Sequence, residues 1–420
     1  MPHRNVTKKQ ALDYHQFPEP GKISVETTKP VETQKDLSLA YTPGVATPCL
    51  EIEKNQENAY KYTAKGNLVA VISNGTAVLG LGNLGALASK PVMEGKGVLF
   101  KKFSGLDSFD IEVDTESVDR FCSVVTAIAP TFGGINLEDI KSPECFEIER
   151  RLVEELDIPV MHDDQHGTAV ISAAAIINAC KITNKKIENL KIVVVGAGAA
   201  AISCARLYRV MGATNIIMLD SRGVVHCGRS DLNDFKREFL HNGYLTHAEA
   251  FEGADVVLGL SRPGTFTIED IKTMSENPIV FALSNPTPEV FPDDVLKARP
   301  DAIVATGRSD FDNQVNNVLG FPFIFRGAMD VHAKKINIEM KIAAAEALAQ
   351  LATKEVPEYI NELYGKKLEF GKDYIIPKPF DKRLIVEISS AVAVAAVQSG
   401  SSTMKDFNLD EYKKELATRI

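Results

Sequence analysis

The sequence feature that most constrains the fold is one stretch, residues 190–220, which reads LKIVVVGAGAAAISCARLYRVMGATNIIMLD. It begins with a short β-branched run that is typical of a buried strand and that breaks at a glycine-rich turn. A helical pattern follows to about Gly212, and a second strand pattern ends at Asp220. Two strands joined through one helix form a βαβ unit, so the stretch predicts an α/β fold around a parallel sheet.

The rest of the chain continues this alternation. The strand-like runs ADVVLGLS, PIVFALSNP and AIVATG are separated by helical segments, which is typical of a doubly wound, Rossmann-type sheet. Upstream, LVAVISN, GVLFKKF and IPVMH also read as strands between helical stretches. After Val331 the pattern is helical, with apolar stripes that need cover. We therefore expect a second, smaller α/β domain that the C-terminal helices complete.

The glycine turn predicts a dinucleotide site. Gly196 permits a tight turn, Gly198 lets the backbone approach a pyrophosphate, and Ala201 lets the helix pack closely on the strand. The phosphates would lie at the positive end of the helix, and Asp220 would accept hydrogen bonds from ribose hydroxyls. A glycine turn without a ligand is the alternative, but the complete strand–turn–helix–strand–acid order favours NAD or NADP. Within this unit the expected contacts are Gly196, Ala197, Gly198, Ala199, Ala200, Ala201 and Asp220.

The choice between NAD and NADP stays open from these residues, because Asp220 repels a 2′-phosphate whereas Arg222 can accept one. The expected organisation has three parts. They are an N-terminal arm (1–36), a substrate and catalytic domain (37–163 plus 317–420) and an NAD(P)-binding domain (164–316).

The composition excludes several classes of partner. The formal net charge is −9, so we expect neither a nucleic-acid nor a membrane partner. The six cysteines include no CxxC pair, which argues against a zinc ribbon or a disulfide framework and favours a reducing compartment. The N-terminus has no apolar signal segment, and the longest apolar runs are too short to span a bilayer. These observations predict a cytoplasmic protein.

Four short motifs outside the dinucleotide unit carry chemical groups: LAYTPGVA, KPVMEGKGVLF, INLEDIK and HDDQHGTA. Each alone has an ordinary explanation, such as a tyrosine in a proline turn, a solvated loop lysine before a strand, or acids that cap a helix. Together they offer three hard oxygen ligands, namely Glu138, Asp139 and one of Asp163 and Asp164, which suits Mg²⁺ or Mn²⁺. A zinc site on the two histidines of HDDQHGTA is disfavoured by their spacing and context. A lysine and a tyrosine remain to move protons, so the set fits oxidation of a hydroxy acid followed by loss of CO₂.

The motifs YTPGVA, GLGNLG, KPVMEGK, HDDQHGTA, GAGAAA, LSNPTPE and NQVNNVLGFPF occur in that order. In this combination, from about Leu37 through the last helices, the chain closely resembles the malic enzyme family and most of all its short, bacterial-type branch. The resemblance implies a homodimeric enzyme that converts L-malate to pyruvate and CO₂ while it reduces NAD or NADP with a divalent metal.

The resemblance also implies a role for each matching residue. Tyr41 matches the general acid, Lys96 matches the general base, and Asp163 matches a neighbour that supports the base. The metal ligands are matched by Glu138, Asp139 and Asp164, and contacts to malate or the nicotinamide by Asn285 and Asn317. One departure is that Ala77 stands where larger members have a substrate-binding arginine. A substrate carboxylate must therefore find another cation.

A general base must be neutral, so the hypothesis requires that burial and the metal charge lower the pKa of Lys96. Three other functions stay open. They are a dehydrogenase of a related amino or hydroxy acid that does not decarboxylate, a malolactic enzyme that forms lactate, and a non-catalytic nucleotide sensor. The sensor is disfavoured because Tyr41, Lys96 and the three acids are all present.

Overall fold

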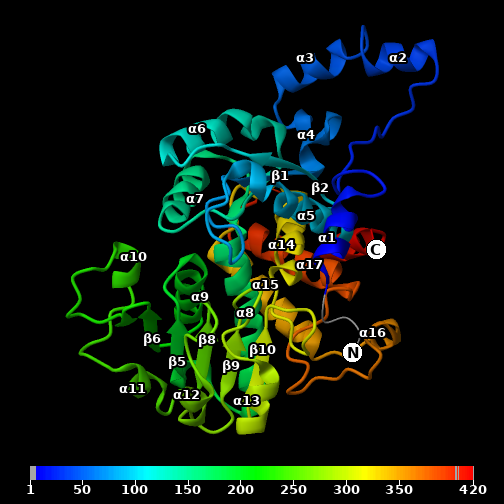
Figure 1. Ribbon diagram of the computed structural model, residues 1–420. Helices are drawn as coiled ribbons and strands as arrows, with labels where there is room; N and C mark the ends of the chain where they lie inside the picture. Colours follow the sequence, from blue (N-terminus) through cyan, green and yellow to red (C-terminus); the bar gives the residue numbers. More distant parts are fainter. Residues whose placement is uncertain (1–5, 403, 405, 420) are drawn as a thin grey trace.

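The computed structural model describes residues 6–402, 404 and 406–419, so the first five residues of the expected N-terminal arm and positions 403, 405 and 420 of the expected catalytic domain lie outside the described residues. The chain forms two sheets, one of four strands and one of six, each flanked by helices (Figure 1). This confirms the predicted α/β architecture. Across the described ranges, no helix is both long enough and apolar enough to cross a membrane.

The smaller sheet is wholly parallel, in the order β2-β1-β3-β4. Its strands are β1 (Leu68–Ser73), β2 (Asp107–Glu112), β3 (Gly134–Leu137) and β4 (Val160–His162), and its helices are α5 (Ala86–Ser104), α6 (Val118–Ile128) and α7 (Glu144–Glu155). The central strand β1 is buried throughout, as expected of a strand that helices cover on both faces. Because the chain moves from one side of β1 to the other between β2 and β3, the sheet has a topological switch point between β1 and β3.

One predicted strand is wrong. The run GVLFKKF belongs to α5, and the strand at this point of the chain is β2, whose sequence DSFDIE is largely polar. The buried residues of α5 recur three or four positions apart (Ala86, Ser89, Met93, Gly97, Phe100 and Ser104), which is the period of a helix. β2 lies at the edge of the sheet and is partly exposed, so it lacks the apolar run by which the other strands were found.

The larger sheet has the order β10-β9-β8-β5-β6-β7. Its strands are β5 (Lys191–Val195), β6 (Asn215–Asp220), β7 (Gly223–Val224), β8 (Val256–Gly259), β9 (Ile279–Ala282) and β10 (Ile303–Thr306). Its helices are α9 (Ala199–Val210), α10 (Asp234–Arg237), α11 (His247–Phe251), α12 (Ile268–Lys272) and α13 (Pro292–Ala298). This is the strand order of Rossmann-type domains, so that prediction is confirmed. However, β7, which follows β6 at the edge of the sheet, is only two residues long and runs antiparallel to β6.

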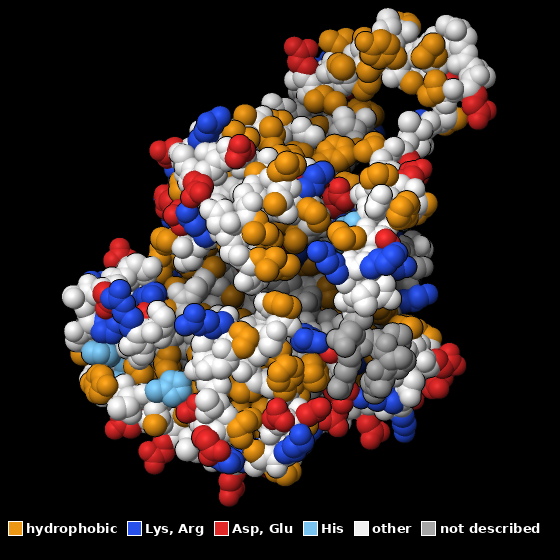
Figure 2. All heavy atoms as spheres, viewed as in Figure 1, with side chains coloured by type: hydrophobic (Ala, Val, Ile, Leu, Met, Phe, Trp, Pro, Cys, Tyr) orange, Lys and Arg blue, Asp and Glu red, His pale blue; other side chains and the backbone are white. Residues whose placement is uncertain are grey.

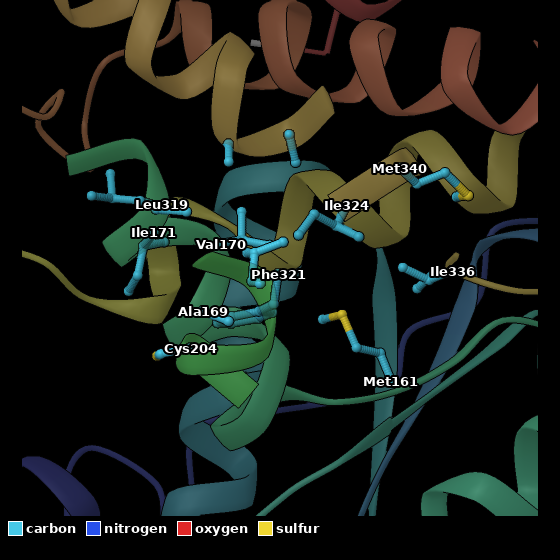
Figure 3. Close-up of a cluster of buried hydrophobic side chains, with 14 of the residues drawn as sticks. Met161, Ala169, Val170, Ile171, Cys204, Leu319, Phe321, Ile324, Ile336 and Met340 are labelled. Carbon is cyan, nitrogen blue, oxygen red and sulfur yellow. The ribbon is translucent and has the colours of Figure 1, made fainter. Parts of the chain in front are cut away.

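Helix α8 (Asp163–Thr183) begins directly after β4 and leads toward the larger sheet. It is buried along most of its length, packing on α9 and α15. Figure 3 shows side chains of the buried cluster around α8, with Ala169 and Val170 of α8, Cys204 of α9, Phe321 and Ile324 of α14 (Phe321–Asp330) and Met340 of α15 (Ile338–Ala352) labelled. The first turn of α8 is therefore held on a packed core.

The C-terminal helices pack on the smaller sheet's side of the molecule, as predicted. α14 contacts α5 and α17 (Arg383–Gln398), and α15 contacts α8 and α17. The shorter α16 (Glu358–Tyr364) and α18 (Leu409–Ala417) complete this part of the fold.

From residue 6 to the start of β1, the described chain carries four short α-helices, of which α2 and α3 project from the body (Figure 1). They are α1 (Lys8–Gln16), α2 (Gln34–Ala40), α3 (Ala46–Lys54) and α4 (Asn58–Tyr62), and none has a buried residue. Hydrophobic side chains cover much of this projection in Figure 2, and Leu39, Tyr41 and Leu50 are each more than half exposed.

Candidate active site

The predicted acidic residues lie at the carboxyl ends of two neighbouring strands. Glu138 and Asp139 follow β3 directly, and Asp163 and Asp164 open α8 directly after β4. β3 and β4 are paired in parallel, with Leu137 opposite His162, so the four acids emerge at the same edge of the sheet. Ligands of α/β proteins bind at this edge, near the switch point.

Three of these acids converge. Glu138, Asp139 and Asp164 each offer a carboxylate oxygen, and these oxygens lie within 4.8 Å of one another. The backbone N–H of Asp139 donates to the Asp164 carboxylate at 2.8 Å, and Asn136 donates to Glu138 at 2.9 Å. One oxygen of Asp139, Oδ2, is buried without a hydrogen-bond partner.

This set fits a divalent cation of the Mg²⁺ or Mn²⁺ type, because all its donors are carboxylate oxygens and one of them has no other partner. The electrostatics agree. Burial and the neighbouring acids raise the pKa of Glu138 well above its usual value, and burial together with Asp164 raises the pKa of Asp139 to about 8. Acids held together at this cost are stabilised when a cation lies among them.

Lys96 reaches the same cluster from α5. Its ammonium group hydrogen-bonds the Asp163 carboxylate, lies 3.0 Å from Glu138 Oε1 and stands 4.4 Å from the centre of the Phe321 ring. Burial alone would lower the pKa of Lys96, but the carboxylates, led by Asp163 and Glu138, outweigh burial and raise it above the usual value. The hypothesis required a lowered pKa for Lys96, but without a metal the pKa is raised, because Asp163, Glu138 and Asp164 surround the lysine.

Asn317 also contacts Asp163. It lies in the 3₁₀ turn η4 (Asn317–Leu319), and its amide donates to Asp163 Oδ2 at 3.0 Å and to the Asp163 carbonyl at 3.2 Å. Thr168 donates in turn to the Asn317 side-chain oxygen at 3.1 Å. Asp163 therefore joins Lys96 from the smaller domain to Asn317 at the junction with the larger one.

Sequence reasoning missed two residues of this cluster, Asn136 and Phe321. Both lie inside motifs that had been singled out, INLEDIK and NQVNNVLGFPF. An amide and a phenyl ring neither bind Mg²⁺ strongly nor transfer protons, so the sequence did not single them out. Their part in the site follows only from the contacts of Asn136 with Glu138 and of Phe321 with Lys96.

The glycine turn has the backbone geometry of a dinucleotide site. Gly196 has φ +121°, and a Cβ there would lie 2.5 Å from the Leu260 carbonyl oxygen, so only glycine fits. Gly198 precedes α9, and a Cβ there would meet nothing within 4 Å. Ala201 is buried against the core, whereas Ala197, Ala199 and Ala200 are partly accessible. The N-terminus of α9 is thus open to a phosphate.

Asp220 lies at the end of β6, as predicted, but its carboxylate is already engaged. Arg229 donates to both oxygens at 2.8 and 3.0 Å, Lys236 donates at 2.7 Å, and the backbone N–H of Arg222 donates at 2.9 Å. Burial would raise the pKa of Asp220, but these donors lower it to about 2. Four donors fill the acceptor sites of a carboxylate, so little capacity is left for ribose hydroxyls.

Asn285 lies on an exposed loop after β9, where the two domains meet. Gly80, in the GLGNLG loop of the smaller domain, packs on it so closely that a Cβ there would lie 2.4 Å from the Asn285 carbonyl oxygen. On the same loop Ala77, the position of the missing arginine, donates its backbone N–H to the Asp139 carbonyl at 2.9 Å. The GLGNLG loop therefore runs from the acidic cluster to the larger domain.

Tyr41 does not join the cluster. It lies at the end of α2 on the segment that projects from the body (α2 and α3, residues 34–54), with 69% of its surface exposed. This segment is called the projecting arm and differs from the N-terminal arm 1–36. Among the residues that the structure describes, no hydrogen bond connects its hydroxyl with Lys96 or with the acids. The structure thus brings together every predicted catalytic and metal-binding residue except this one.

Comparison with known proteins gives consistent matches along the chain. Residues 20–153 match the family model described as malic enzyme, N-terminal domain, and residues 165–366 match malic enzyme, NAD binding domain. An NADP-dependent malic enzyme of Halomonas elongata is 60% identical, with 94% of this chain and 95% of that protein covered. A malic enzyme of Pyrococcus horikoshii has a similar crystal structure, with a TM-score of 0.89, 42% identity and coverage of 98% of this chain and 95% of that one.

Other relatives are longer. An NADP-dependent malic enzyme of Escherichia coli is 58% identical over 97% of this chain, and an NAD-dependent malic enzyme of Rhizobium meliloti is 54% identical over 99% of it. In both cases the match covers 55% of the relative, so this chain spans about half the length of these proteins.

Proposed function

The chain belongs to the malic enzyme family and is an NAD(P)-dependent enzyme, and from this premise we propose that it oxidises L-malate and decarboxylates the product to pyruvate and CO₂. The observation that carries the proposal is the convergence of Glu138, Asp139 and Asp164 beside Lys96. A dehydrogenase that only transfers hydride needs a base and a cofactor, whereas loss of CO₂ also needs a group that withdraws electrons from the substrate oxygens.

The three acids hold Mg²⁺ or Mn²⁺ in this proposal. The bound ion supplies a Lewis acid beside the substrate oxygens and a positive charge that balances the acids around Lys96. Lys96 accepts the proton of the C2 hydroxyl as hydride leaves C2 for the nicotinamide. Asp163 and Asn317 keep the lysine amine at the place where it does so.

Tyr41 donates the proton that C3 needs after decarboxylation, and we propose that a second copy of the chain supplies it in a homodimer. Within one chain Tyr41 is exposed on an arm whose helices bury no residue. The arm also exposes Leu39 and Leu50, and apolar side chains gathered on a projecting segment favour an interface. Each chain also exposes Leu79, Leu81 and Leu84 in and just before the GLGNLG loop, beside the acids. The projecting arm of a partner chain could cover this apolar surface.

We propose NADP as the preferred cofactor. Asp220 is paired with Arg229 and Lys236. Arg222, at the same strand end, is paired with Asp231 at 2.9 Å and keeps 70% of its side chain exposed, so three cations face two acids here. The surface at the end of β6 is therefore net positive, which favours a 2′-phosphate. An unpaired Asp220 would repel that phosphate. Arg222→Gln should raise the KM for NADP about tenfold and leave that for NAD unchanged, since one charge-assisted hydrogen bond is lost. Arg237→Gln, on nearby α10, is the control, and equal effects on both cofactors would contradict the assignment.

We also keep as a proposal the division into an arm (1–36), a catalytic domain (37–163 plus 317–420) and a nucleotide-binding domain (164–316). The decisive experiment is one assay with L-malate, Mn²⁺ and NAD or NADP in which reduced cofactor, pyruvate and CO₂ are measured together. Equal amounts of the three products are expected. Reduced cofactor without CO₂ would indicate a simple dehydrogenase, and lactate would indicate a malolactic enzyme.

A further inference from the structure

Glu149 lies behind the acidic cluster and is used by none of the steps above. It belongs to α7, and only 12% of its side chain is exposed. Its Oε1 accepts the backbone N–H of His162 at 2.8 Å, and its Oε2 pairs with the His166 ring nitrogen at 2.9 Å. A buried carboxylate with two such partners is a fixed element of the structure.

The two partners of Glu149 flank the two acids of the site. His162 ends β4, and Asp163 and Asp164 follow it as the first residues of α8. His166 lies two residues after Asp164 on the same helix. β4 is the edge strand, and His162, the residue before α8, makes no side-chain cap to that helix. Glu149, from α7, instead accepts the backbone N–H of His162, the N-cap residue of α8. It therefore anchors the start of α8, as a capping side chain ordinarily does.

The short spacing makes this arrangement sensitive. Asp163 must reach Lys96 and Asn317, while Asp164 must reach the backbone N–H of Asp139, from adjacent positions of one helical turn. A small rotation of that turn would move both carboxylates at once. The His162 ring has no hydrogen-bond partner, and its Nδ1 lies 3.8 Å from Asp164, so it does not hold the acid in place.

We propose that Glu149 is a positioning residue, which holds His162 and His166 and thereby fixes Asp163 and Asp164 for the metal and for Lys96. The charge state of Glu149 agrees: burial would raise its pKa, but His166 and Lys341 of α15 outweigh burial and lower it to about 2. The inference rests on the proposed function, because it assumes that Asp164 is a metal ligand.

The test is direct binding of Mn²⁺ to the full chain, measured from the electron paramagnetic resonance signal of free Mn²⁺, without turnover. Glu149→Ala should weaken Mn²⁺ binding by about 10- to 100-fold, the range known for residues that support a ligand. Binding of NADPH, followed by its fluorescence, should stay within about twofold, because the dinucleotide turn lies on the other sheet. Glu154→Ala, an exposed glutamate on the same helix, is the matched control.

Glu149→Gln keeps the shape of the side chain and should recover part of the lost affinity, which general destabilisation would not predict. If Glu149→Ala does not fold, His166→Gln removes one of the two hydrogen bonds from the other side and should weaken Mn²⁺ binding in the same way. Unchanged Mn²⁺ affinity in a folded variant, or an equal loss of Mn²⁺ and NADPH affinity, would overturn the positioning role. A parent protein that binds no Mn²⁺ would overturn the proposed function, and this inference with it.

Discussion

Lys96 contacts two acids that have different parts in the proposed reaction: Glu138 is a proposed metal ligand, and Asp163 is not. Replacing the lysine removes the proposed base but leaves the dinucleotide turn untouched. Lys96→Ala should therefore lower the rate of malate oxidation by about 10²- to 10⁴-fold, the usual contribution of a general base. The rate is followed by the absorbance of reduced cofactor, and NADPH affinity by fluorescence.

Lys102→Ala is the control for this variant, because Lys102 lies on the same helix and is exposed. Its turnover should equal that of the parent. A Lys96→Ala enzyme with near-normal turnover, or one that no longer binds NADPH, would remove the lysine from the proposed mechanism.

Asp139 predicts how stability depends on pH. Its pKa is raised from 3.8 to about 8, so the folded protein without metal binds a proton that the unfolded chain releases at a lower pH. Stability therefore falls as pH rises from about 4 to about 8 and changes no further from this group above that pH. Melting temperatures of metal-free protein between pH 5 and 9 should show this slope. Asp139→Asn should reduce this slope and leave the part that Glu138 contributes, and a slope of the opposite sign would contradict the assignment.

At the same scale, the residue types alone indicated a set of oxygen ligands but left Asp163 and Asp164 open. The resemblance to the malic enzyme family assigned Asp164 to the metal and Lys96 to the general base. The sequence was not sufficient to place Tyr41, whose exposure is a property of the folded arm. Nor did it reveal that Asp220 is paired with Arg229 and Lys236, which lie up to 16 positions further along the chain. Long-range partners decide what a side chain is free to bind, and no local pattern encodes them.

At the scale of elements, the Rossmann-type unit was predictable because strand, turn, helix and acid follow one another without a break. Helix α5 was not, since its buried face includes Ser89, Gly97 and Ser104, which do not read as apolar. Gly97 is small because a Cβ there would lie 2.7 Å from Ser108 Oγ on β2. The close approach of the helix to the edge strand therefore favours glycine at a position that the sequence had predicted to be the start of a strand.

The packing of α14 on α17 gives a prediction at this scale. α14 begins with Phe321, the ring beside Lys96, and a Cβ on Gly327 would lie 2.4 Å from the Ser389 carbonyl oxygen of α17. Gly327→Ala should therefore push the helices apart and lower the free energy of unfolding by about 1–3 kcal/mol. Thermal denaturation measures the change.

Gly95→Ala is the matched control, because Gly95 is also a helical glycine but a Cβ there would meet only Lys22 Nζ, at 3.9 Å. Its stability should stay the same or rise by about 0.5–1 kcal/mol, since alanine favours the helix. Equal destabilisation by both variants would mean that the close contact between α14 and α17 is not the cause.

At the scale of the whole molecule, the proposed active site lies where three separate parts of the chain meet. The smaller sheet provides the acids, α5 provides Lys96, and the turn before α14 provides Asn317 from beyond the nucleotide-binding domain. The projecting arm (residues 34–54) is the fourth part, and its described residues make no hydrogen bond or ion pair with the acids or with Lys96 within one chain. In the proposed homodimer the projecting arm of one chain completes the site of the other. Activity is therefore expected of the dimer and not of a single chain.

Complementation tests this arrangement. Lys96→Ala and Tyr41→Phe are each expected to be nearly inactive as homodimers. In a mixed dimer whose arms act across the interface, one site carries both defects and the other carries neither. Random assembly of the two variants in one cell makes half of the dimers mixed, so about a quarter of the parent activity should return. If Tyr41 served its own chain, every site would keep one defect and no activity would return, which would leave the exposed tyrosine without a role in catalysis across the dimer.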